Sequence, residues 1–184
     1  MNASFPIAAA TATLAVRLQM LILDAVPGAQ VTTLNPSSEQ LRSGEPFVNL
    51  YLFRTVRNSP ASNLDLPTRD AAGQPRSIPA LELTLEYMIT FYGDDSRLDS
   101  QRLLGLVAGG LSASPVFDPA EVAATIAARP WLGNADAPMA PMRLLPMDLT
   151  LEEMTRVWSA FSNAPFQLTQ FYRLESVVLS EPGH

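Results

Sequence analysis

Residues 80–92 read ALELTLEYMITFY, and the rest of the fold can be worked out from this stretch. Apolar side chains occupy every second position, at Leu81, Leu83, Leu85, Tyr87, Ile89 and Phe91. The positions between them begin with Glu82, Thr84 and Glu86. A period of two places the apolar side chains on one face of an extended segment. The stretch therefore predicts a half-buried antiparallel strand.

A second strand is predicted just before the first. Residues 47–57, FVNLYLFRTVR, are rich in the β-branched and aromatic side chains that favour strands. A period of two places four of its apolar side chains on one face: Val48, Leu50, Leu52 and Val56. The two strands can pair as neighbours in one sheet.

The segment between these strands, residues 58–79, has no sustained periodicity. It contains Pro60, Pro67, Gly73, Pro75 and Pro79, which interrupt regular structure. A loop this long inside a compact domain is usually either functional or disordered. We therefore expect residues 58–79 to form a long loop or arm.

The N-terminal part of the chain predicts a helix. Apolar residues recur at helical spacing over residues 7–25, and Pro27 with Gly28 ends the pattern. The opposite side of this helix is also apolar, with Val16, Met20 and Leu23. Such a helix is either deeply buried or uses its second face to bind a partner. A short strand over residues 30–34 and a polar loop over residues 35–45 follow.

Two more helices are expected after the central strand. Asp99 or Ser100 is the expected N-cap of the first. The second begins at residues 118–121, DPAE, which combine an N-cap, a proline and a glutamate in the order typical of a helix start. It should end near Ala128, because Pro130 disfavours helical geometry in the residue before it.

The C-terminal third predicts a short strand and a helix. Residues 142–147 are apolar, and Pro146 indicates a strand at the edge of the sheet because proline cannot donate to a central ladder. Thr150 and Glu153 form a capping box. The sequence therefore predicts a helix over residues 151–161.

Residues 166–179 form the last predicted strand, with four side chains on one face: Leu168, Tyr172, Leu174 and Val178. The order of elements predicts an α+β fold with a single, mainly antiparallel sheet of about four strands backed by helices. A chain of 184 residues is the usual size of one domain. We expect residues 1–184 to form that domain, with residues 180–184 frayed.

Composition excludes several classes of protein. The chain has 18 acidic and 12 basic residues, the latter all arginine, and a net charge of -6, so it lacks the positive charge that binds nucleic acid. The absence of cysteine excludes disulfides and thiolate metal sites, and the cytoplasm is the expected compartment. Arg17, Gln19 and Asp24 interrupt the apolar residues 5–26, so we expect neither a membrane span nor a secretory signal there.

Candidate catalytic groups are few. The single histidine, His184, is the last residue, where a catalytic or metal-binding role is not expected. The acidic pairs are Asp94 with Asp95, Glu82 with Glu86, and Glu152 with Glu153. Turn formation, the polar face of a strand and the first turn of a helix explain these pairs. The sequence therefore predicts no catalytic, cofactor-binding or metal-binding residue, and a protein that is not an enzyme.

Several apolar side chains suggest buried contacts with other proteins instead. Trp131 lies in a proline-rich loop, and an aromatic group follows towards the C-terminus: Phe161, Phe166, Phe171 and Tyr172. Burial in the core is the alternative for each of them.

Five segments resemble one known family. They are VNLYLFRTVRNSP (48–60), IPALELTLEYMITFYG (78–93), QRLLGLVAGGLSASPVF (101–117), MRLLPMDLTLEEMTRVWSAF (142–161) and PFQLTQFYRLESVVL (165–179). Together they make the chain similar to the cap, or tail-terminator, proteins of phage-tail-like extracellular contractile injection systems. The similarity spans most of the chain.

This resemblance implies a structural role without a cofactor. The family forms a ring, expected to be hexameric, on the distal end of the inner tube, where the last sheath layer grips it and polymerisation ends. Tube protein, sheath protein and further copies of the chain are the implied partners, in a particle made in the cytoplasm. The residues expected at these interfaces are Arg54, Arg57, Leu64, Arg69, Arg76, Glu82, Glu86 and Trp131.

Two alternatives remain open at this point. A small-molecule-binding α+β domain, or a carboxylate enzyme, would have a deep apolar pocket with a strongly shifted acid. A peripheral membrane adaptor would use the first helix as an amphipathic anchor, but such helices usually carry several basic residues.

Overall fold

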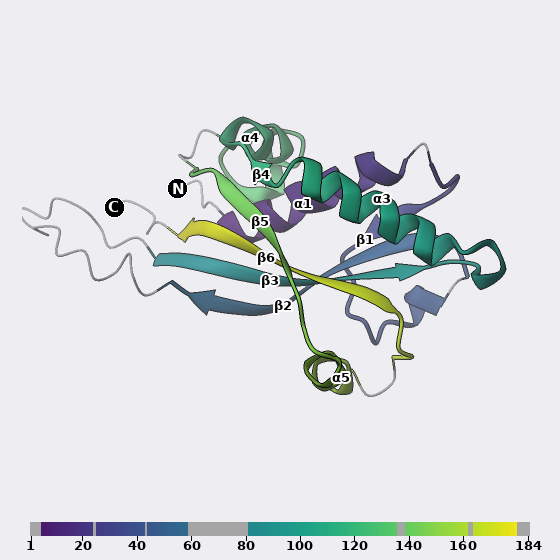
Figure 1. Ribbon diagram of the computed structural model, residues 1–184. Helices are drawn as coiled ribbons and strands as arrows, with labels where there is room; N and C mark the ends of the chain where they lie inside the picture. Colours follow the sequence, from purple (N-terminus) through teal and green to yellow (C-terminus); the bar gives the residue numbers. More distant parts are fainter. Residues whose placement is uncertain are drawn as a thin grey trace, which may run out of the picture.

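The computed structural model describes residues 5–23, 25–42, 44–58, 81–135, 139–161 and 164–179. The predicted arm after Asn58 and the predicted frayed end at residues 180–184 lie outside these described residues. Figure 1 shows how the described elements are arranged.

One sheet organises the described residues, and it has six strands in the order β1-β2-β3-β6-β5-β4. The strands are β1 (Gln30–Thr32), β2 (Phe47–Arg57), β3 (Leu81–Tyr92), β4 (Val116–Phe117), β5 (Met142–Met147) and β6 (Leu168–Leu179). All neighbours are antiparallel except β1 and β2. The α+β class is confirmed, but the prediction of about four strands is wrong. The two outermost strands, β1 and β4, are too short to give a clear periodic signal.

Helices cover both faces of the sheet unequally. The α-helices are α1 (Pro6–Ile22), α3 (Asp99–Ala113), α4 (Pro119–Ala127) and α5 (Leu151–Ser159). Short 3₁₀ helices are η1 (Glu39–Arg42), η2 (Asp95–Arg97) and η3 (Pro130–Leu132). Figure 1 shows α1, α3 and α4 together on one face, and α5 on the other. No helix within the described residues is both long and apolar enough to span a membrane.

The central strand, β3, is buried on both of its faces. Its odd-numbered apolar residues enter the main core with α1, α3 and α4. On the other face, Met88 packs with Trp158 of α5 and Phe171 of β6. The prediction that β3 is half-buried is therefore wrong, because Thr84 and Glu86 are each only 8% exposed. Each Å² of buried apolar surface stabilises the fold by about 25 cal/mol, so a strand that is buried on both faces contributes strongly to the stability of the sheet.

Two bulges change which side chains share a face. An extra residue at Phe53 shifts the β2 register, so Val56 pairs with Thr84 and faces away from the main core. A second shift in β6 lies near Ser176, which has a φ of 67°. As a result Val177 enters the main core in place of Val178. The predictions for Val56 and Val178 are wrong because a bulge reverses the alternation that follows it.

The edge strand β1 is closed by a side chain of α1. The Gln19 side-chain amide donates to the Ala29 carbonyl at 3.2 Å, and its oxygen accepts from the Val31 N–H at 2.9 Å. The amide thus satisfies one donor and one acceptor that a further strand would otherwise use.

The opposite edge strand, β4, is closed by Arg17 of the same helix. Its guanidinium donates to the carbonyls of Ser114 at 2.6 Å and Val116 at 2.9 Å. It forms a bidentate ion pair with Glu121 of α4. Its central carbon lies 3.5 Å from the centre of the Phe117 ring. Since Arg17 and Gln19 are two residues apart on one helix, the sheet must curl to bring both of its edges within their reach.

The position of β5 differs from its prediction as an edge strand. It is the second strand from the edge, but β4 covers only Met142 and Arg143. The Leu144 N–H donates to the Pro115 carbonyl at 2.8 Å, so the backbone N–H and carbonyl of Leu144 point away from β6. The backbone nitrogen of Pro146, two residues later, points to the same side. Its missing N–H therefore leaves the ladder with β6 intact.

The predicted helix starts were correct in position, although the capping hydrogen bonds were not always those predicted. The α5 capping box is present, with Thr150 Oγ1 accepting from the Glu153 N–H. Asp118 precedes α4 but its side chain makes no capping hydrogen bond. Asp99 is the first residue of α3 rather than its N-cap, and it accepts a hydrogen bond from Arg102. The chain leaves α5 at Ser159, two residues before the predicted end.

Close packing of α1 on α3 requires a glycine at position 110. A Cβ atom at Gly110 would lie 2.7 Å from Cδ1 and 2.9 Å from Cγ of Leu21, whereas a Cβ at Gly109 would meet nothing within 4 Å. We expect Gly110→Ala to lower the free energy of unfolding by about 1–3 kcal/mol, because the added methyl group overpacks the contact. Gly109→Ala should instead raise it by up to about 1 kcal/mol through helix propensity.

Urea denaturation followed by circular dichroism measures both changes. In a Leu21→Ala background the loss caused by Gly110→Ala should disappear, because the clashing side chain is gone. An equal loss in both backgrounds would contradict the proposed contact.

Arg17→Met should lower the free energy of unfolding by about 2–3 kcal/mol, since it leaves the largely buried Glu121 carboxylate and the carbonyls of Ser114 and Val116 without their donor. Arg156→Met is the matched control, because Arg156 and its partner Glu152 are both 75% exposed. Exposed pairs of this kind contribute at most about 0.5 kcal/mol. Equal effects of the two variants in the same denaturation assay would refute the role assigned to Arg17.

Candidate docking surfaces

The structure places four of the predicted interface residues near the same ends of two strands. Arg54 and Arg57 are in β2, and Glu82 and Glu86 are in β3. Trp131 is in η3. The other three, Leu64, Arg69 and Arg76, lie outside the described residues.

A row of alternating charge crosses the sheet at this place. Arg54 lies opposite Glu86, and their side chains approach to 3.4 Å. Glu86 lies opposite Arg173 of β6 on its other side, and Arg173 contacts Glu175 at 3.1 Å. Directly opposed residues point to the same face of a sheet. These four residues, which we call the charged row, therefore share the face on which α5 lies (Figure 1).

The charged row contained residues that sequence reasoning missed. Arg173 and Glu175 occupy alternate positions of one strand, but only the register with β3 brings them next to Glu86. The Arg54 side chain is 64% exposed and that of Glu86 only 10%. The row thus presents arginine to solvent above a nearly buried carboxylate.

Glu82 is held at the end of the β2–β3 pair. Its carboxylate accepts from the Asn58 side-chain amide at 3.3 Å, and its backbone carbonyl accepts from the Asn58 N–H at 3.0 Å. Thr84 donates to the Asn58 side-chain oxygen at 3.0 Å. These contacts fix Asn58 beside Glu82, so the two ends of the 59–80 segment start from neighbouring positions.

Arg57 faces the other side of the sheet. It lies opposite Leu83, whose side chain is in the main core. It is exposed and has no ion pair with any residue that the structure describes. The structure therefore separates Arg57 from Arg54, Glu82 and Glu86 by the thickness of the sheet.

Trp131 belongs to a second surface. Its side chain is 69% exposed and borders a groove of about 340 Å³ beside α1. The groove is lined by the small residues of that helix together with three others: Ala8, Thr11, Ala12, Ala15, Thr33, Arg129 and Trp131. Helix α1 lies on the face opposite α5, so this surface is separate from the charged row (Figure 1).

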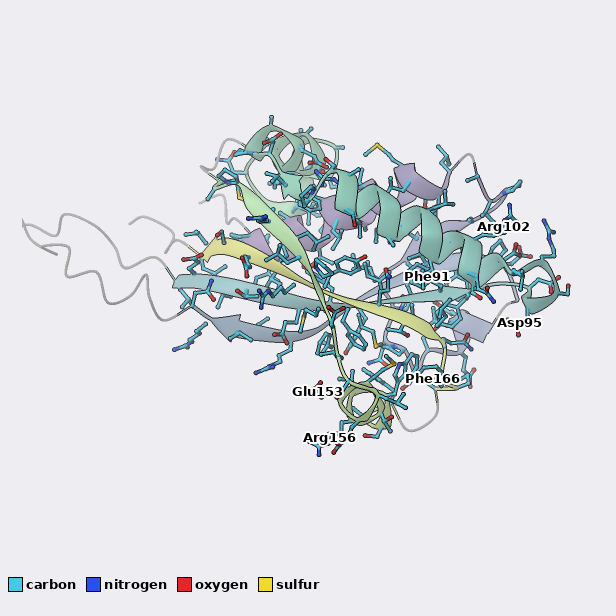
Figure 2. The ribbon with its side chains drawn as sticks, in the orientation of Figure 1. Phe91, Asp95, Arg102, Glu153, Arg156 and Phe166 are labelled. Atoms are coloured by element: carbon cyan, nitrogen blue, oxygen red, sulfur yellow. The ribbon has the colours of Figure 1, made fainter. Side chains whose placement is uncertain are left out.

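The aromatic residues near the C-terminus are mostly used inside the monomer. Phe171 and Tyr172 are buried at 3% and 5% exposure. Phe161 packs edge-on against Tyr51, with ring centres 5.5 Å apart. Phe166 remains 61% exposed beside α5, where Figure 2 labels it. Only Phe166 of this predicted group is therefore available for a partner.

The acidic pairs examined for catalysis behave as structural groups. The Ser96 hydroxyl and N–H, both bonded to the Asp94 carboxylate, lower the Asp94 pKa. The Thr150 N–H lowers the Glu153 pKa in the same way. A general acid at neutral pH would need its pKa raised instead. Within the described part of the chain, no cluster of three or more histidine, aspartate or glutamate residues could bind a metal.

One small cavity has two carboxylates in its lining. It holds about 260 Å³, and its lining includes Glu45, Asp95 and Tyr92. Burial raises the pKa of Tyr92 to about 12, so its hydroxyl stays protonated. Small-molecule sites usually measure about 300–1,000 Å³. This cavity lies below that range.

A family model described as the Pvc16 N-terminal domain matches residues 9–183. The chain belongs to this family. The match covers nearly the whole sequence, and it confirms the resemblance carried by the five sequence segments. No match was found among curated proteins.

Two solved structures share the fold. One is the sheath/tube terminator of an extracellular contractile injection system, PVC, in its extended state: TM-score 0.58, 14% identity, covering 96% of this chain and 57% of that one. The other is the tube-terminating cap of the anti-feeding prophage, AFP: TM-score 0.54, 14% identity, covering 93% and 54%. The chain thus spans a little over half the length of each of these proteins.

The two tryptophans allow the exposed surface to be tested separately from the core. Trp131→Ala should change the free energy of unfolding by less than about 0.5 kcal/mol, because the side chain is mostly in solvent. Trp158→Ala is the control, since Trp158 is 7% exposed under α5 and its loss should remove about 3–5 kcal/mol. A large loss of stability in Trp131→Ala would show that this side chain serves the monomer and not a partner.

Proposed function

We propose that the chain is a structural cap subunit that ends the polymerisation of the tube and sheath of a contractile injection particle. The observation that carries this proposal is the match of nearly the whole fold to two proteins that are themselves named as terminators or caps of such particles. The family match over residues 9–183 supports it independently of the fold.

The surfaces of the monomer suit this task. A subunit that ends a filament binds the last subunits but offers no equivalent new end, so its two docking surfaces must differ. The charged row and the Trp131 groove lie on opposite faces and have different chemistry. Contacts between unlike surfaces that close on themselves produce a ring. We infer a hexameric ring of this chain on the distal end of the tube.

Tube protein and sheath protein are the proposed partners, and the particle is proposed to assemble in the cytoplasm. We assign Arg54, Glu82, Glu86 and Trp131 to these interfaces, and Arg57 to a contact on the other side of the strand pair. We also assign to these interfaces Leu64, Arg69 and Arg76, which belong to the segment between β2 and β3. Each stable interface should bury on the order of 1,000 Å² or more. Such a role needs shape complementarity and no catalytic group.

The test is to tag the chain in its native host, sediment large particles and identify the co-sedimenting proteins by mass spectrometry. We expect a tube protein and a sheath protein in fixed ratio, with the chain at a few copies per particle. Electron microscopy of a deletion strain should show tubes of irregular length, because nothing ends their growth. Recovery of the chain alone, at monomer size, would refute the cap function.

The segment between β2 and β3 can be tested in the same assay. Because Asn58 and Glu82 are hydrogen-bonded neighbours, a short turn such as Asn-Gly can replace residues 60–80. We expect the shortened chain to keep its circular dichroism spectrum and melting temperature within a few degrees, but to be absent from sedimented particles. Normal recovery in particles would show that this segment is not needed for capping.

A further inference from the structure

Contacts within the chain close several of the described sheet edges. Gln19 satisfies the outer edge of β1, Arg17 that of β4, and Pro146 removes the donor from the uncovered end of β5. Strand β2 has a long open edge, since β1 pairs with it only from Phe47 to Asn49. No strand among the described residues pairs with the outer side of residues 50–57. Figure 1 shows β2 as the outermost strand there.

The free backbone groups on this edge can be assigned. Asn58 donates to Glu82 of β3, so its backbone groups face inward. Alternation along the strand then turns the groups of Val56 towards β3 and those of Thr55 and Arg57 outward. Both Thr55 and Arg57 are exposed. The edge therefore offers donors and acceptors that no strand among the described residues uses.

The charges along this edge favour one kind of occupant. Arg54 and Arg57 are three positions apart in an extended strand, so they lie on opposite faces. A strand whose basic residues oppose Arg54 or Arg57 would place like charges next to each other. Like charges directly opposite each other destabilise a strand pair. The two exposed arginines, one on each face, thus favour an acidic strand.

We propose that the outer edge of residues 50–57 binds an extended acidic segment of another protein as a seventh strand. The segment carries two carboxylates three positions apart, one beside Arg54 on one face and one beside Arg57 on the other. Backbone hydrogen bonds to Thr55 and Arg57 supply affinity, and the two charge pairs supply selectivity. This binding does not depend on the cap function, and either proposal can fail alone.

The probe is the synthetic peptide TVETVEVT, titrated into the nitrogen-15-labelled full-length chain and followed by amide chemical shifts. We expect concentration-dependent shifts at residues 50–57. The control peptide TVRTVRVT, with arginine at both glutamate positions, should bind about tenfold more weakly because both charge pairs become repulsive. The double variant Arg54→Glu with Arg57→Glu should reverse this preference.

Two substitutions at one position isolate the backbone contribution. Thr55→Pro removes an outward N–H without touching the ladder to β3, so the sheet should survive while peptide binding is lost. Thr55→Ala keeps the N–H and should bind like the wild type. If the proline variant fails to fold, the charge-reversed variant still decides the question.

Three outcomes would overturn the proposal. They are the absence of peptide-induced shifts at residues 50–57, equal binding by the Thr55→Pro and Thr55→Ala variants, and shifts at these residues that depend on protein concentration alone. The third would mean that a second copy occupies the edge despite its arginines.

Discussion

The sheet depends on one helix whose side chains form hydrogen bonds at both of its edges. Arg17 and Gln19 of α1 each supply side-chain hydrogen bonds to an edge strand, one to β4 and the other beside β1. A strand as short as β4 has little stability of its own, so it persists because a buried guanidinium satisfies its carbonyl. The same helix fills the concave face with Ala9, Leu14 and Leu18. Curvature, edge closure and the main core are therefore properties of one helix.

Helix α1 is committed to the interior, so the proposed docking surfaces lie where this helix does not cover the fold. The α5 face carries the charged row, and the outer rim of α1 carries Trp131 beside small side chains. A protein built to meet unlike neighbours on opposite sides needs this division, since a symmetric surface would recruit more of itself.

Local signals in the sequence were sufficient for much of the fold. The alternation in β3 and the capping box of α5 each lie within a few adjacent residues. The strand and the capping box were predicted correctly, but the burial of the second face of β3 was not. The bulges at Phe53 and Ser176 were not, because they result from how the strands twist against their neighbours. Arg173 escaped notice for the same reason, since only the register sets it beside Glu86. Trp131 was singled out because a large aromatic in a proline-rich loop is unusual on its own, and its interface role stays a prediction.

The two tryptophans differ in one more useful respect. The Trp158 indole is enclosed by Phe161, Phe166 and the α5 core, whereas Trp131 stands in solvent. Excitation of the native chain thus yields one shielded emitter and one that collisional quenchers can reach. Any partner that covers the rim of α1 should shift the emission towards the blue and protect it from acrylamide. The chain carries its own optical reporter of docking, with an internal reference.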